Sequence, residues 1–350
     1  MPANKNAMTR YKILDELLSN WYHNYTTTKK IKIFNIINPM KRTFLIMTFF
    51  LCGLCCFGQT TITEEYFNKI DNAYQNAEWE KVLQYCDSID YYKIDFPYAL
   101  LKAEALAGLE RYDEAINHLK SLENTDGIEP YYITNTLGNI YWLKDDLETA
   151  ISYYETTIEL RPSYARPYIY LGYIYQQLEK KDKAIEYFMG AIELFYANGL
   201  LDEVEEFTRI IISELDSTYI YAYLYLERAY HEKGNFRYAM SVCSDIDKLC
   251  EQYDVEVPIL IENIFHTGEN IFFLNDYESS SIIFLEYLNM LEYYRDPLYN
   301  SECEANVYLG LISEHFKDKK EAKKYFQKAK KIDEERADSL LKYIADMNEN

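Results

Sequence analysis

The residue types that usually carry out enzymatic chemistry are sparse in this sequence and form no recognisable catalytic set. Its five histidines are scattered, and none belongs to a His-Glu-x-x-His pattern, which places two zinc ligands on one helix face. Neither a glycine-rich phosphate loop nor a Gly-x-Ser-x-Gly nucleophile elbow occurs. Adjacent acids such as Glu205-Glu206 are common in a chain with a net charge of −21 and suit a solvated helix face. We therefore expect no enzyme, no cofactor and no metal site.

Cysteine chemistry is also not indicated. Cys52, Cys55 and Cys56 lie in an uncharged apolar run, where they read as hydrophobic residues. Cys243 and Cys250 are separated along a helix by about 10.5 Å, which is too far for a disulfide. We expect the cysteines outside the apolar run to be reduced packing residues.

Composition indicates a helical protein that does not bind nucleic acid. Hydrophobic residues make up 49% of the chain, and there are only 11 glycines and 8 prolines, so long helices with short connections are expected. Residues 1–58 hold eight basic and two acidic residues, which leaves 28 basic and 55 acidic residues in the strongly acidic remainder. A body of that charge repels phosphate backbones, so we exclude nucleic acid as a partner.

Residues 40–58 have the pattern of a secretory signal peptide. Lys41 and Arg42 precede an uncharged apolar segment, 43–58, that is shorter than the ~20 residues of a membrane-spanning helix. We therefore expect export to the periplasm or cell envelope. Membrane anchoring through an uncleaved 43–58 is the alternative, and it would be the chain's one membrane contact. Residues 1–39 are interpreted as an upstream extension that precedes a start at Met40.

The rest of the chain contains an internal repeat. Leu137-Gly138-x-x-Tyr141 is followed by Ala150 and Tyr154, and the same order of large, small and aromatic residues returns 34 positions later, beginning at Leu171-Gly172. A small residue recurs 12 positions after the first small residue of each unit. The positions expected to pack at these helix crossings are Gly138, Ala150, Gly172, Ala184, Ala239, Gly268, Gly310 and Ala322.

This pattern resembles the tetratricopeptide repeat, in which each unit is a pair of antiparallel helices. The resemblance implies an all-α fold, a right-handed α-solenoid of about seven helix-turn-helix repeats over residues 63–336. Small residues are expected to let the two helices of a unit cross closely, with Gly138 opposite Ala150 and Gly172 opposite Ala184.

Two interruptions of the repeat predict the domain organisation. Residues 199–219 fit no unit and are expected to form an extra helix or linker. They would separate an N-terminal array, 63–198, from a C-terminal array, 220–336. Residues 337–350 are expected to form a capping helix, which an open-ended array requires.

The resemblance also implies a concave groove lined by the first helix of each unit, where proteins of this family bind peptides or protein segments. Aromatic rings and amides in such a groove suit an extended segment. The residues expected to face the groove are Asn135, Asn139, Trp142, Arg166, Ile169, Tyr173, Gln176, Tyr221, Leu224, Arg228, Phe265 and Phe272, with His231 and Glu269 beside the last five.

We therefore expect a non-enzymatic scaffold of the cell envelope that binds a protein or peptide segment. Two alternatives remain open at this point. One is a glycan-binding envelope protein that uses exposed aromatic rings, and the other is a sensory module whose effector is a separate chain.

Overall fold

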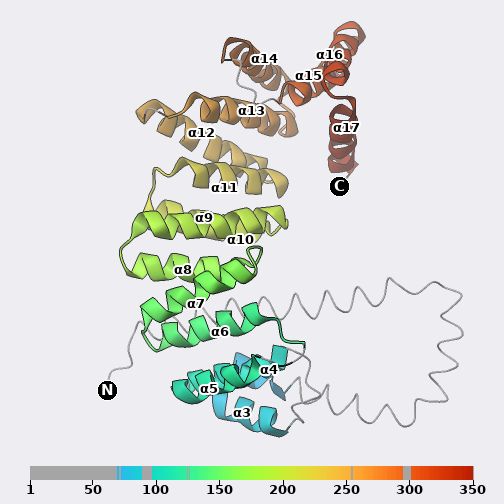
Figure 1. Cartoon of the computed structure of the whole chain (residues 1–350). Coiled ribbons are helices and arrows are strands. Elements are labelled where there is room, and N and C mark those ends of the chain that lie inside the picture. The colour runs from blue at the N-terminus through green and yellow to red at the C-terminus, as the bar shows by residue number, and fades with distance from the viewer. Residues whose placement is uncertain are drawn as a thin grey trace, which may run out of the picture. The chain divides into compact units, whose positions relative to one another are not determined.

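The computed structural model describes residues 69–70, 72–88, 97–123, 125, 127–253, 255–294 and 301–349, and these residues are helical with no strand among them (Figure 1). The predicted all-α fold is therefore confirmed. In chain order the elements are α3 Trp79–Ser88, α4 Pro97–Gly108, α5 Tyr112–Leu122, α6 Pro130–Leu143, α7 Leu147–Leu160, α8 Ala165–Gln177, α9 Lys181–Ala197, α10 Leu201–Ile210, the π-helical turn η2 Ile211–Leu215, α11 Ile220–Glu232, α12 Phe236–Gln252, α13 Val257–Phe273, α14 Tyr277–Tyr294, α15 Glu302–His315, α16 Lys319–Ile332 and α17 Glu334–Glu349.

The same turn geometry recurs between the two helices of each pair. Asp145, between α6 and α7, has a φ of 69°, and its N–H donates to the Trp142 carbonyl at 3.1 Å. The N–H of Asp146 donates to the Tyr141 carbonyl at 2.9 Å, which completes the left-handed motif that commonly ends a helix. Equivalent residues with positive φ are Ala77, Glu110, Glu179, Gly234, Asn275 and Lys317. These turns mark seven helix-turn-helix units in the described chain, as the repeat pattern predicts.

Aspartate often follows the left-handed residue and caps the next helix. The Asp146 carboxylate accepts a hydrogen bond from the Thr149 N–H at 3.2 Å, and that of Asp318 accepts one from the Glu321 N–H at 3.0 Å. Each bond satisfies an amide that the first helical turn would otherwise leave without a partner. A single short turn therefore ends one helix and begins the next.

Close helix crossings explain the glycines of the repeat. A Cβ added to Gly138 would lie 2.7 Å from the Tyr154 ring, and one added to Gly310 would lie 2.5 Å from the Phe326 ring. The aromatic ring 16 positions later thus fills the space beside the glycine of its helix pair. In the unit of α13 and α14, the Ser280 hydroxyl donates to the Gly268 carbonyl at 2.9 Å, so the two small positions meet directly.

The chain divides into two compact units, 1–174 and 175–350, with the division inside α8. Within the first unit, Val82, Leu106, Leu119 and Leu137 belong to one buried cluster that runs from α3 to α6. This division differs in position from the predicted one, because residues 199–219 lie inside the second unit as α10 and η2.

The second unit ends in a helix that packs against its predecessors. Ala337 and Ile344 of α17 are buried, Ala337 in a cluster with Val307 of α15 and Ala329 of α16. The extension 1–39, the signal segment 40–58 and the membrane anchor proposed at 43–58 lie outside the described residues. Among the helices that are described, none combines the length and the apolar character that a bilayer crossing requires.

Candidate binding site

In the first of the two compact units, 1–174, the residues expected to line a groove are mostly buried. Trp142 is 2% exposed, and its ring lies 5.8 Å from that of Tyr170. Asn139 accepts a hydrogen bond from the Tyr154 hydroxyl at 2.8 Å, within the crossing of α6 and α7. Trp142 therefore offers no surface to a ligand, and the expectation that it faces an open groove is not met. The reason is that the ring packs against Tyr170 of α8, in the next helix pair.

The other predicted groove residues that do not line the cavity described below also pack against neighbouring side chains or form hydrogen bonds. Ile169 and Asn135 are buried, as is Phe272, whose ring packs at 5.0 Å from that of Tyr308. The remaining positions, Arg166, Tyr173 and Gln176, are partly buried. The Gln176 amide donates to the Glu214 carboxylate at 2.9 Å.

In the second unit, several of the predicted groove residues lie close together. Tyr221, Leu224 and Arg228 of α11 and Phe265 of α13 line one cavity of about 870 Å³, together with His231 and Glu269. Their spacing of three or four residues places them on one face of each helix. We call this cavity the aromatic–acidic pocket. Its complete lining is Tyr196, Tyr221, Leu224, Tyr225, Arg228, His231, Glu232, Glu262, Phe265, His266, Glu269, Ser301, Glu304, Arg336, Leu340 and Tyr343.

Sequence reasoning missed the wall that α15 and α17 provide. Glu304 lies in the first helix of its unit, so extending the groove positions to that unit would have found it. Arg336, Leu340 and Tyr343 belong to α17, and the repeat pattern contains no signal that this helix lines the pocket.

Paired charges fix the arginines of the pocket. Arg228 Nη1 lies 2.9 Å from Glu269 Oε2, and the Tyr308 hydroxyl donates to the other oxygen of Glu269 at 3.0 Å. Burial lowers the pKa of Arg228, but the nearby carboxylates outweigh it and raise that pKa. Arg336 forms an ion pair with Glu304, whose own pKa burial raises. Both arginines are therefore held in place.

A second network of polar side chains lies buried behind the pocket wall. Glu227 is fully buried, and its carboxylate lies 2.9 Å from His266 Nδ1 and accepts a hydrogen bond from the Asn270 amide at 2.6 Å. The oxygen of that amide accepts a hydrogen bond from His231 Nδ1 at 2.8 Å. Burial raises the pKa of Glu227, but His266, Arg228 and Asn270 outweigh it, so the pKa is lowered and the carboxylate stays charged.

Glu227 occupies the position that is glycine in the most regular units. Sixteen positions later, where those units have an aromatic ring, this unit has Cys243, which is fully buried and unbonded to another cysteine. The Asn270 amide contacts both Glu227 and the Cys243 sulfur, at 2.6 Å and 3.8 Å. In this unit the larger side chain is therefore at position 227 and the smaller one at position 243. The Glu227 carboxylate occupies the space that an aromatic ring fills in the regular units.

The lining of the pocket combines aromatic rings with charged side chains. In the part of the chain that the structure describes, no three His, Cys, Asp or Glu side chains are placed to hold a metal ion. Four carboxylates face two arginines in the lining, so the pocket carries excess negative charge. Its aromatic rings and carboxylates suit a ligand with apolar and positively charged groups.

Comparison with known families supports the repeat found in the sequence. The tetratricopeptide repeat model matches residues 133–164, 165–198 and 304–336. These three segments of the chain are therefore tetratricopeptide repeats. The matched segments cover most of the α6–α7, α8–α9 and α15–α16 pairs, each of which has a glycine in its first helix. No curated protein is significantly similar to the chain.

Several solved structures resemble this chain. The Cut9-Hcn1 structure of the APC/C hetero-tetramer matches with 14% identity and a TM-score of 0.38, covering 79% of this chain and 55% of that chain. This chain thus corresponds to about half of the matched Cut9-Hcn1 chain. A tetratricopeptide repeat protein from Parabacteroides merdae ATCC 43184 matches with 14% identity and a TM-score of 0.31, covering 80% and 97%. The C-terminal part of a repeat protein from Cytophaga hutchinsonii matches with 14% identity and a TM-score of 0.31, covering 78% and 98%.

Proposed function

We propose that this protein is a non-enzymatic scaffold that binds a segment of a partner protein in the aromatic–acidic pocket. The observation that carries the proposal is the assembly of that pocket from five helices, α9, α11, α13, α15 and α17. The pocket is large enough for several side chains and is open at residues such as Tyr221, which is 44% exposed. The repeat family that the three segments match is one of interaction modules, in agreement with this role.

The lining favours a segment that carries both a basic and an apolar side chain. Glu262 is 28% exposed at the pocket wall, and its nearest basic neighbour, His266, is 4.0 Å away. A lysine or arginine of the partner would find this carboxylate together with the faces of Tyr225 and Phe265. The arginines of the pocket are already bound to carboxylates, so they do not attract an acidic segment strongly.

We further propose that the scaffold acts in the cell envelope after export, which is supported by the charge and hydropathy pattern of residues 40–58. Amino-terminal sequencing of the mature protein tests this proposal. A terminus near Gln59 supports export with cleavage, whereas a terminus upstream of Met40 contradicts the interpretation of residues 1–39.

Selection of peptides tests the binding proposal directly. A random peptide library displayed on phage is panned on the full chain, and the selected peptides are titrated calorimetrically. The Tyr221→Ala/Tyr225→Ala variant removes two rings of the pocket. We expect it to weaken binding about tenfold, as loss of aromatic anchors usually does.

The matched control is Tyr238→Ala/Tyr293→Ala, which removes two exposed tyrosines of α12 and α14 that do not line the pocket. This control should leave the affinity within about twofold, because surface contacts away from a site contribute little. Equal losses in both variants, or selected peptides without basic residues, would refute the proposed pocket.

A further inference from the structure

Positive charge is concentrated on one helix of this acidic protein. Residues 317–331, which contain nearly all of α16, hold eight lysines and two acids, although the whole chain has a net charge of −21. Among the described residues, six of the eight lysines have no carboxylate within ion-pair distance: Lys317, Lys319, Lys320, Lys323, Lys328 and Lys331. This concentration is not explained by the fold's own salt bridges.

The helix dipole does not explain the lysines either. Lys330 and Lys331 lie in the last turn of α16, where positive charge is favourable. Lys319 and Lys320 occupy its first turn, where the positive end of the helix disfavours them. Positive charge is thus present at the end of α16 where local electrostatics oppose it.

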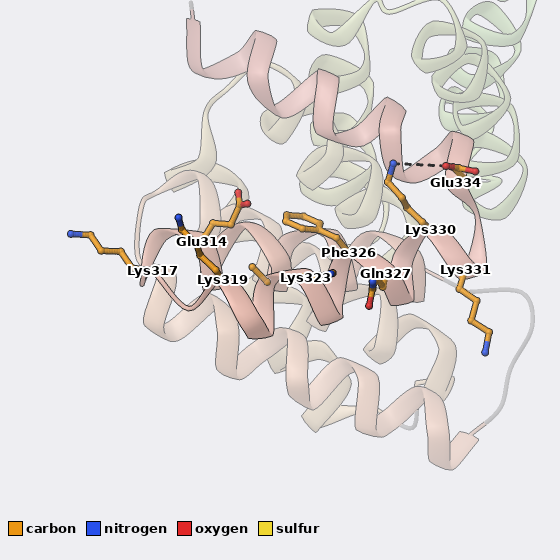
Figure 2. A pocket seen from close by; sticks show the side chains of 10 residues that line it. Glu314, Lys317, Lys319, Lys323, Phe326, Gln327, Lys330, Lys331 and Glu334 are labelled. Atoms are coloured by element: carbon orange, nitrogen blue, oxygen red, sulfur yellow. Dashed lines mark ion pairs between the residues drawn. The ribbon is translucent and has the colours of Figure 1, made fainter.

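These lysines line a groove. It has a volume of about 750 Å³ and is bordered along α16 by Lys319, Lys323 and Lys330, with Phe326 and Ala322 between them (Figure 2). Phe326 is only partly buried, because one side of its ring packs on Gly310 and the rest faces the groove. We call this site the lysine groove. It differs from the aromatic–acidic pocket in every lining residue.

We propose that the lysine groove binds an acidic, extended protein segment with acids at alternating positions. Lys319 and Lys323 are one helical turn apart, about 6 Å along the axis. Side chains at alternating positions of an extended chain are about 6.6 Å apart on one face, so two such acids match the two lysines.

The negative charge of the rest of the chain does not prevent this interaction. At physiological ionic strength, interactions between exposed charges are screened beyond about 8 Å, so the approaching acids respond mainly to the local lysines. Glu334, which lines one end of the groove, lies 3.9 Å from Lys330 and is therefore partly neutralised (Figure 2).

Fluorescence anisotropy of the full chain tests the proposal. The probe is a fluorescein-labelled peptide, Glu-Ala-Glu-Leu-Glu-Ala-Glu, and the comparison peptide has glutamine in place of each glutamate. The Lys319→Glu/Lys323→Glu variant reverses two charges of the groove, and we expect its affinity for the acidic peptide to fall about tenfold or more. The glutamine peptide should bind about tenfold more weakly than the acidic one.

A matched control reverses the same number of charges on the same helix. Lys320 and Lys324 are exposed but do not line the groove, so Lys320→Glu/Lys324→Glu should weaken binding less than about threefold. Equal losses in both variants would refute the proposal, because they would show a general attraction to the basic helix.

Other occupants of the groove give different results. If the chain dimerises with increasing concentration and Lys319→Glu/Lys323→Glu abolishes the dimer, the occupant of the groove is a second copy of the chain and not an acidic segment. Preferential binding of phosphatidylglycerol vesicles over the peptide would replace it by an anionic membrane surface. Either result overturns the proposal, and unchanged melting temperatures of both variants establish that the losses are not due to unfolding.

Discussion

The role of the buried Glu227 carboxylate can be tested by restoring the residue sizes of the regular units, which have a small residue at the position of 227 and an aromatic ring at the position of 243. Glu227→Gly removes the carboxylate that faces His266 and Asn270. Cys243→Phe supplies the ring that the neighbouring unit has at Phe284, opposite Gly268. Each single change should be harmful, whereas the two together should restore the packing of a regular unit.

The structure sets the expected magnitudes. Removing a buried hydrogen-bonded group leaves its partners unsatisfied at a cost of about 1–3 kcal/mol, and more where the group is charged. Glu227 is fully buried with two polar partners. Adding a ring beside the intact carboxylate overpacks the crossing by about 1–3 kcal/mol. In the double variant the ring occupies the vacated space, so the total loss should be smaller than that of Glu227→Gly alone. The coupling between the two sites should therefore be at least about 1 kcal/mol.

Urea unfolding followed by far-ultraviolet circular dichroism measures each free energy of unfolding. Cys243→Ala is the control for loss of the thiol and should change stability by less than about 1 kcal/mol, since no disulfide is lost and the sulfur makes one weak contact. Additive losses in the double variant would refute the reasoning, because they would mean that Glu227 and Cys243 do not share one space.

Two further predictions concern the left-handed turns and the Glu104 carboxylate of α4. Glu110→Gly should stabilise the protein by about 1 kcal/mol because Glu110 has a φ of 61°, whereas Gly234→Ala, at a φ of 72°, should destabilise it by a similar amount; thermal melts compare the two. Burial raises the pKa of Glu104 to about 7, although Tyr74 and Arg166 oppose the rise. The protonated form is thus favoured in the folded state, and this contribution to stability is lost as the pH rises through about 7, by at most about 1.4 kcal/mol per pH unit. Urea midpoints between about pH 5 and pH 8 should therefore fall less in Glu104→Gln than in the wild type, and parallel curves would contradict the assignment.

The sequence predicted the repeat because the repeat is a local pattern. Gly138 and Tyr154 lie in adjacent helices of one unit, so their spacing carries the geometry of the crossing directly. The same reasoning found the α11 and α13 walls of the aromatic–acidic pocket, where groove positions recur at helical spacing.

Exposure was harder to predict than position. Trp142 occupies a groove position in its helix, but the ring of Tyr170 covers it, and that contact joins two neighbouring units. The wall formed by Tyr343 of α17 also depends on how a non-repeating helix folds back. Such contacts depend on the stacking of units, which a pattern within one unit does not encode.

The seven left-handed turns have a consequence for the order of folding. Their backbone bonds join residues close in sequence, such as Asp146 with Tyr141, so each helix pair closes only a short loop when it forms. Contacts of this kind favour rapid folding that begins at several places and spreads between neighbours. The bond between Glu227 and Asn270 joins residues 43 positions apart and belongs to two different pairs. It therefore forms after both helix pairs have folded, and it holds the α11–α12 pair against the α13–α14 pair.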